Sequence, residues 1–419
     1  MDLVVRNATL AGRPGSHDIA IEGGRIAAVG PELAVQGVPE LDAEHGLVTP
    51  TFVNPHVHLD KALLGETMRP NVSQTLQEAI EITWDFKRTY TVEDILTRAS
   101  ACVDAAVAQG TTVLRVFADV GTIGGLTPVE ALIALRERWR GIADIQVVAF
   151  PQEGIDRDPG TESLLDKAMQ MGADVAGGLP WYERTDAHMR RHVDVVLELA
   201  RRYDADVHML VDDTDDATSR SLEYLAVRTI EAGWQGRVAA SHCGALARYN
   251  DVHAAKVVAL VKESGVAIVS NPHISLVLAG RADREPIPRG ITRVRELLAA
   301  GVNVASGQDD IKDPYYPFGR GSQLEVALFM AHTAHLTHPP ELEQVLAMVT
   351  ANAARALRLP DYGIAPGSHA DLNVWRAPNV QDLLRLQEPP RHVLKRGRLL
   401  ASWSVTCDRR WATPPARSS

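Results

Sequence analysis

Short apolar runs alternate with amphipathic stretches through the middle of the chain. Amphipathic stretches of helical period occur, for example, at 92–108, 162–171, 192–202 and 219–232. Several end in Gly just before the next apolar run, as helix-to-strand loops commonly do. The runs typical of buried strands are 46–53, 111–117, 144–150, 173–177, 205–210, 237–242, 265–270 and 301–306.

Eight strand–helix units in succession predict an α/β fold, a closed (β/α)8 TIM-type barrel. A doubly wound open sheet is the alternative. The glycines at 121–125 do not have the G-x-G-x-x-G spacing of its phosphate-binding turn, and this favours the barrel.

The two ends of the chain differ from the middle. Short strand patterns lie at 3–10, 18–22 and 25–29, and again at 370–375 and 393–400. They predict a small β-sandwich domain made from both termini, with boundaries at 1–48 and 366–411 and the barrel over 49–365. The last residues, 412–419, are rich in Pro, Ser and Arg, and we expect a disordered tail.

Composition excludes some classes of function. The chain has 419 residues, a net charge of −10 and 45% hydrophobic residues, so it is globular and acidic. Nucleic acid and anionic membranes are therefore not expected as partners. Its 3 cysteines are far apart and predict no disulfide framework. No signal-peptide pattern or long apolar run is present, and a cytoplasmic protein is expected.

Polar residues at the ends of the expected strands carry the candidate chemistry. His56 and His58 alternate on an extended segment, so both side chains point to the same face. His208, His242 and Asp309 each end a later apolar run, and barrel closure would bring them to the same mouth. Three of these imidazoles and the one carboxylate suit one divalent metal, zinc or iron.

Each residue also has a structural alternative when taken singly. His242 could be an ordinary hydrogen-bonded histidine, and residues 309–310 could cap the following helix. Gln152 could belong to a simple turn, and Lys61 could be a surface lysine. The combination of so many polar residues at one end of successive strands favours the metal site.

The whole chain resembles the amidohydrolase superfamily, and within it the cytosine deaminase-like group. The segments that carry the resemblance are Pro55-His56-Val57-His58-Leu59-Asp60, Ala149-Phe150-Pro151-Gln152-Glu153-Gly154-Ile155, Val207-His208 with Asp212-Asp213, Ser241-His242, 289–294, Asp309-Asp310 with Asp313-Pro314, and 361–364.

The resemblance implies a role for each matching residue. The metal would be held by His56, His58, His208 and Asp309. Asp309 would also act as catalytic base, and His242 would polarise the bond under attack. On the substrate side, the resemblance implies that Gln152 binds the ring and that Asp310 lines the pocket.

Three positions depart from the family pattern. Val211 stands where cytosine deaminases carry a glutamate three residues after the strand-5 histidine, and Phe117 and Gln308 each replace a histidine. We expect Phe117 and Val211 to make the substrate pocket apolar. Lys61, which replaces threonine, would add an anion contact, and Tyr315 could stack on a planar ring.

The leading hypothesis is a metal-dependent hydrolase of a carbon–nitrogen bond in a small nitrogen heterocycle. It would be a deaminase or amine-releasing enzyme acting on a pyrimidine- or triazine-like ring, and not on cytosine itself, because Val211 cannot transfer a proton. The alternatives are ring opening of a cyclic amide or ureide, and a catalytically silent ligand-binding relative. The resemblance also implies a homo-oligomer.

Overall fold

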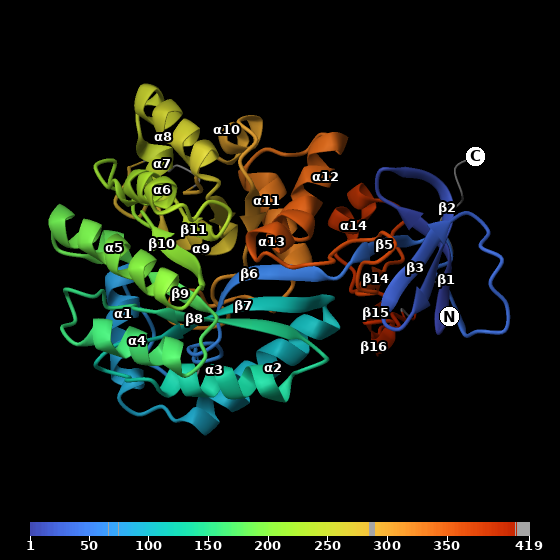
Figure 1. Cartoon of the computed structure of the whole chain (residues 1–419), viewed down its shortest axis with the longest axis horizontal. Coiled ribbons are helices and arrows are strands. Elements are labelled where there is room, and N and C mark those ends of the chain that lie inside the picture. Colours follow the sequence, from blue (N-terminus) through green and yellow to red (C-terminus); the bar gives the residue numbers. More distant parts are fainter. Residues whose placement is uncertain (66, 74, 285–289, 407, 409–419) are drawn as a thin grey trace.

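A closed barrel of parallel strands forms the larger part of the molecule (Figure 1). The computed structural model describes residues 1–65, 67–73, 75–284, 290–406 and 408. The barrel strands, hydrogen-bonded in chain order, are β6 (Phe52–His58), β7 (Thr111–Asp119), β8 (Asp144–Phe150), β9 (Val175–Gly178), β10 (Asp206–Val211), β11 (Val238–His242), β12 (Ala267–Ser270) and β13 (Val304–Ser306).

The barrel closes next to the predicted site. Val57 in β6 forms a parallel bridge with Asp309, which lies just beyond β13. The amide of His58 donates to the carbonyl of Asp309 at 2.8 Å, and the amide of Asp309 donates to the carbonyl of His56 at 2.9 Å. The predicted barrel is thus confirmed, and the same backbone bonds that close it fix three of the site residues.

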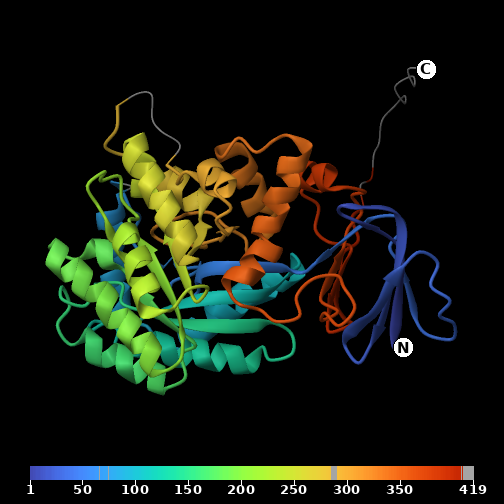
Figure 2. The ribbon, with the colours of Figure 1, turned by 45° about the horizontal axis from the view of Figure 1, so that its top comes forward.

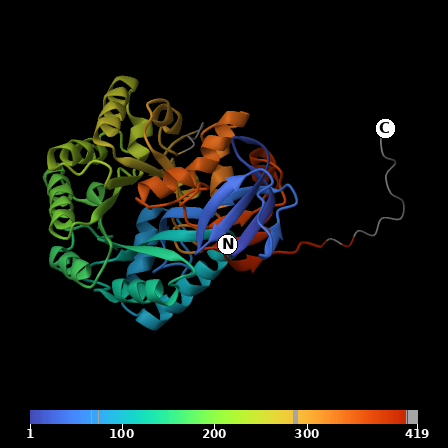
Figure 3. The same ribbon diagram turned by 45° about the vertical axis from the view of Figure 1, so that its right-hand side comes forward.

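Helices surround the barrel, as the turned view in Figure 3 shows. They are α1 (Leu76–Lys87), α2 (Val92–Ala108), α3 (Thr127–Arg138), α4 (Thr161–Gln170), the short η1 (Pro180–Tyr182), α5 (Asp186–Arg202), α6 (Ser221–Ala232), α7 (Gly244–Arg248), α8 (Asp251–Ser264), α9 (Pro272–Leu278), α10 (Val294–Ala299), α11 (Gln323–Thr333), α12 (Pro339–Met348), α13 (Ala351–Ala356) and α14 (Val380–Leu386).

Capping explains where these helices begin and end. The stretch expected at 192–202 starts earlier, at Asp186, because the Thr185 hydroxyl accepts from the amide of His188. Gly265 ends α8 in the left-handed conformation, as expected for a glycine before a strand. No helix of the described residues is both long enough and apolar enough to span a bilayer.

Side chains alternate along each barrel strand, and this decides which residues reach the interior. In β10, Val207, Met209 and Val211 belong to the large hydrophobic core that includes the surrounding helices. Leu210 instead packs with Phe117 and other residues of the barrel interior. One strand therefore presents one set of side chains to the helices and the other to the mouth.

The two ends of the chain form a second sheet beside the barrel (Figure 2). The predicted small sandwich domain is confirmed: β14 pairs antiparallel with β5, and apolar side chains from both termini share one core. The domain boundaries at 48 and 366 stay predictions, and the expected tail lies outside the described residues. The strands of the second sheet are β1 (Leu3–Leu10), β2 (Arg13–Glu22), β3 (Arg25–Gly30), β4 (Glu40–Asp42), β5 (Leu47–Pro50), β14 (Leu372–Val374), β15 (His392–Lys395) and β16 (Arg398–Ser402).

Candidate metal centre and active site

His56, His58 and Asp309 converge at the point where the barrel closes. The Nε2 atoms of His56 and His58 lie 3.3 Å apart. Asp309 Oδ1 lies 3.1 Å from the first and 3.6 Å from the second. Asp309 has φ of 65°, a left-handed conformation that is unfavourable for a non-glycine residue and is often found at functional sites.

His242 completes this group from the end of β11. Its Nε2 lies 3.5 Å from Asp309 Oδ2, and its φ of 68° is also left-handed. Asn271, just after β12, donates from Nδ2 to Asp309 Oδ2 at 3.2 Å and lies 3.4 Å from His242 Nε2. Asn271 thus orients both the carboxylate and the imidazole.

His208 lies beside this group but points its Nε2 elsewhere. The His208 and His56 ring centres are 5.4 Å apart. His208 Nε2 is 2.6 Å from Ser241 Oγ, which is also 2.7 Å from His56 Nδ1. For His208 to ligate a metal through Nε2, this bond to Ser241 must be given up. Among the described residues, four sets of possible ligand atoms already lie together, and none of them includes His208. The sets are His56–His242–Asp309, His58–Asp309–Asp310, His58–Asp60–Asp119 and Asp156–Glu183–His188.

The protonation states of these donors fit a divalent cation. Burial lowers the pKa of His56 to about 4 and holds the pKa of His58 and His208 well below the ordinary value. Burial alone would raise the pKa of Asp309, but His242, His56 and Lys61 together lower it to about 2. Neutral imidazoles and an ionised carboxylate are the forms that bind zinc or ferrous iron.

Two residues expected in the substrate pocket are placed elsewhere. Val211 faces the surrounding helices, because alternation from His208 turns every second side chain outward and leaves Leu210 at the pocket. The Phe117 ring stacks on His56 with ring centres 4.0 Å apart and packs against His58 and His208. Phe117 supports the imidazoles and does not line the pocket. Both expectations are corrected accordingly.

The other expected substrate residues line an inner cavity of about 30 Å³. Lys61 is only 3% exposed, so the alternative of a surface lysine is wrong. Its Nζ lies 3.0 Å from His58 Nδ1 and donates to Gln152 Oε1 at 3.1 Å. Asp310 and Tyr315 complete this polar side, and the apolar wall consists of Leu76, Ile80, Leu179, Trp181, Tyr182, Leu210, Ile274 and Leu278.

A buried charge network lies behind Lys61. Lys87 in α1 binds Asp119 and Glu153, each at 2.6 Å. Asp119 lies 3.9 Å from Lys61 and donates its amide to Asp60 at 2.9 Å. Since Glu153 follows Gln152, the network joins α1 to the loop that carries the predicted ring-binding amide.

Known proteins resemble this chain over nearly its whole length. A family model described as "Amidohydrolase family" matches residues 73–401. N-isopropylammelide isopropyl amidohydrolase of Pseudomonas sp. (strain ADP) is 31% identical, and the similarity covers 96% of this chain and 98% of that protein. Pterin deaminase of Rhizobium rhizogenes is 30% identical, and the similarity covers 91% of this chain and 87% of that protein.

A solved structure agrees closely with the fold. The 5-methylcytosine deaminase from Klebsiella pneumoniae, crystallised with 5-fluorocytosine, is 36% identical with a TM-score of 0.93. The similarity covers 97% of this chain and 99% of that one. The chain belongs to the amidohydrolase family. As such it is an enzyme, a metal-dependent hydrolase of carbon–nitrogen bonds.

Several residues of the site were not predicted from the sequence of this amidohydrolase. Ser241 precedes the predicted catalytic residue His242, and Asn271 follows the apolar run 265–270, so position in the pattern could have identified both. Asp213 also reaches the mouth, because Asp212 at φ 53° reverses the chain after β10. Its carboxylate Oδ1 lies 3.4 Å from His242 Nδ1. No sequence signal indicated that turn.

Proposed function

We propose that this amidohydrolase releases ammonia or an amine from a pyrimidine- or triazine-like ring. The observation that carries the proposal is that His58, His242 and Asp309 line the inner cavity, with His56 beside them, next to the polar side chains that could hold a ring. The names of its relatives support the ring class, since they describe action on N-isopropylammelide, pterin and 5-methylcytosine.

One divalent ion, zinc or iron, would be held by His56, His58, His208 and Asp309. Such an ion supplies a Lewis acid and lowers the pKa of a bound water, so that a nucleophile is available near neutral pH. Side chains of the protein would carry out the proton transfers and stabilise the charge that develops on the ring. The metal identity and the place of His208 in the ligand set are part of the proposal.

Asp309 would take the proton from the attacking water and return it to the leaving nitrogen. An ionised carboxylate is suited to the first transfer. His242 would stabilise the developing negative charge on the ring, because its imidazole lies beside Asp309 and faces the cavity.

Gln152 and Asp310 would bind the ring and recognise its polar edge. Burial, Asp313 and Asp309 raise the pKa of Asp310 well above its ordinary value, so this carboxyl can stay protonated and donate to a ring nitrogen. The Gln152 amide would bind the amide-like edge of the ring, with its oxygen already bound to Lys61. Gln152 could then donate through its nitrogen.

The test is product analysis with metal-loaded enzyme on pyrimidines, triazines and pterins. Release of ammonia or an amine at a rate that Asp309→Asn lowers by about 10²-fold or more supports the proposal. A new carboxylate without amine would indicate ring opening of a cyclic amide or ureide. No turnover of any ring by fully loaded protein would indicate the silent ligand-binding relative. The homo-oligomer and the cytoplasmic location stay predictions.

A further inference from the structure

A second, larger cavity, here called the outer cavity, adjoins the inner one. It has a volume of about 340 Å³, within the size range of small-molecule sites. The two cavities meet at a common wall. The residues that line both are Leu76, Trp181, Asp213, Ile274 and Leu278.

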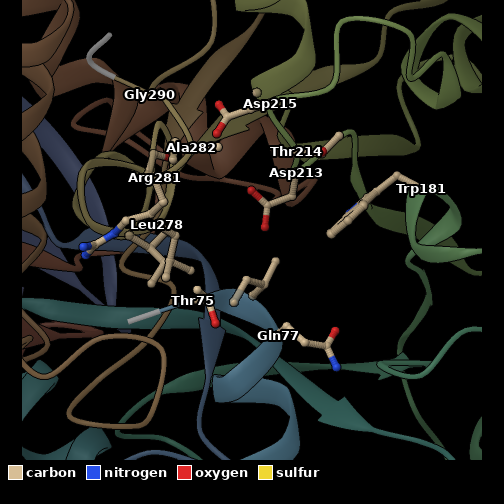
Figure 4. Close-up of a pocket in the computed structure, with 15 residues that line it drawn as sticks. Thr75, Gln77, Trp181, Asp213, Thr214, Asp215, Leu278, Arg281, Ala282 and Gly290 are labelled. Atoms are coloured by element: carbon tan, nitrogen blue, oxygen red, sulfur yellow. The ribbon is translucent and has the colours of Figure 1, made fainter. Parts of the chain in front are cut away.

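Asp213 is the charged residue of that common wall. Its neighbour Asp212 is fully buried and accepts from the amides of Ser221 at 3.0 Å and Leu222 at 2.7 Å. The left-handed turn at Asp212 then sends the next side chain the opposite way. Figure 4 shows the Asp213 carboxylate projecting into the outer cavity, with Trp181 on one side and Leu278 on the other.

The groups around Asp213 do not turn its carboxylate away from the outer cavity. Its contact with His242 Nδ1 is 3.4 Å, longer than a good charge-assisted hydrogen bond, and 30% of its side chain is exposed. Asp215, on the same wall, is already paired with Arg248 at 2.8 Å and with the amide of Gly280 at 2.7 Å. The guanidinium of Arg281 points away from Asp213 in Figure 4.

A carboxylate beside an aromatic face selects for positive charge and for N–H donors. The location adds a second constraint. Asp213 lies on the far side of His242 from Asp309, which would return a proton to the leaving nitrogen. A substituent carried on that nitrogen would therefore extend past His242 toward Asp213 and into the outer cavity.

We propose that the outer cavity is a subsite for a nitrogen-bearing substituent on the leaving amine, with Asp213 as the residue that selects it. This inference rests on the proposed function and adds a substrate class, rings whose exocyclic nitrogen carries a short basic or N–H-rich chain. Asp213 is a specificity-determining residue here.

The experiment compares probes of the same shape that differ in charge. N4-(2-aminoethyl)cytosine and N4-propylcytosine form one pair, and the corresponding substituted ammelides form another. Binding to the metal-loaded enzyme is measured by calorimetry, so the readout does not depend on turnover. We expect the aminoethyl member of the pair that binds to be at least ten-fold tighter, because only its ammonium can pair with the carboxylate.

Two variants test whether Asp213 causes the preference for the charged probe. Asp213→Asn should reduce the preference to within about three-fold while leaving the propyl probe unchanged, since the amide keeps the shape and loses the charge. Asp215→Asn, on the same cavity wall, is the matched control and should keep the full preference. If Asp213→Asn does not fold, the comparison of the two probes on the wild-type enzyme still decides.

Two outcomes overturn the subsite: equal affinity of the wild-type enzyme for charged and neutral probes, or an undiminished preference in folded Asp213→Asn. An enzyme that hydrolyses unsubstituted rings but binds none of the probes overturns it as well. A preference for the aminoethyl probe without hydrolysis of any ring would support the subsite while contradicting the proposed function, so the two failures are distinguishable.

Discussion

The Nζ atom of Lys61 lies 3.0 Å from Nδ1 of His58, so a buried cation contacts a predicted metal ligand from behind. Histidine ligands usually donate their second ring nitrogen to an acceptor that fixes the ring. Here a lysine occupies that position and also holds Gln152. Lys61 therefore couples the predicted metal centre to the predicted ring-binding side chain.

Lys61→Met should lower kcat/KM by about 10- to 100-fold, because Gln152 loses the charge-assisted hydrogen bond that holds its oxygen. Metal affinity should not fall, because the Lys61 ammonium can only donate to His58 Nδ1 and its positive charge opposes a bound cation. Steady-state kinetics and metal titration measure the two effects. The exposed Lys256, replaced by Met, is the control. A kcat/KM of Lys61→Met within two-fold of wild type would refute this role.

Asp212→Ala should destabilise the fold by about 1–3 kcal/mol, because buried hydrogen-bond donors at the start of α6 lose their acceptor. The affected groups are the amides of Ser221 and Leu222 and the hydroxyl of Ser221. Urea denaturation measures the change. Asp212→Asn keeps one acceptor oxygen and should lose less. A loss below about 0.5 kcal/mol, typical of a surface substitution, would contradict this capping role.

His273 should make the protein less stable in acid. It is 1% exposed, and burial lowers its pKa to about 4 although Asp309 opposes the shift. Between pH 4 and the ordinary pKa of 6.5, the unfolded chain binds more protons than the folded one. Stability from this group is therefore present at pH 7 and falls as the pH falls through that range.

His273→Leu should reduce the stability difference between pH 7 and pH 5 by about 2 kcal/mol, since one titrating group is removed. Chemical denaturation at the two pH values measures it. The exposed His332, replaced by Leu, should leave the difference unchanged. Identical pH dependence in His273→Leu and wild type would show that this imidazole does not resist protonation.

Much of the architecture could be predicted because the strand pattern is local. The apolar runs and the glycines that follow the helices were enough to predict the barrel, and barrel closure placed His56, His58, His242 and Asp309 at one mouth. Strand alternation alone would have predicted that Val211 faces outward, opposite to His208. We instead expected Val211 in the pocket because it stands at the position of the family glutamate.

Other features depend on contacts between distant segments. The burial of Lys61 follows from its contacts with Gln152 and Asp119, which no pattern near residue 61 reveals. The turn at Asp212 is set by its hydrogen bonds to α6, and only this turn brings Asp213 to the mouth. The bond between His208 and Ser241 likewise requires the pairing of β10 with β11.

The most direct test of the central claim is the number of metal equivalents bound per chain, measured by elemental analysis for wild type, His56→Ala and Asp309→Asn. We predict about one equivalent of zinc or iron in the wild-type protein and far less in both variants, because each removes a ligand. A wild-type protein that holds no metal even after reconstitution, or variants that retain a full equivalent, would contradict it.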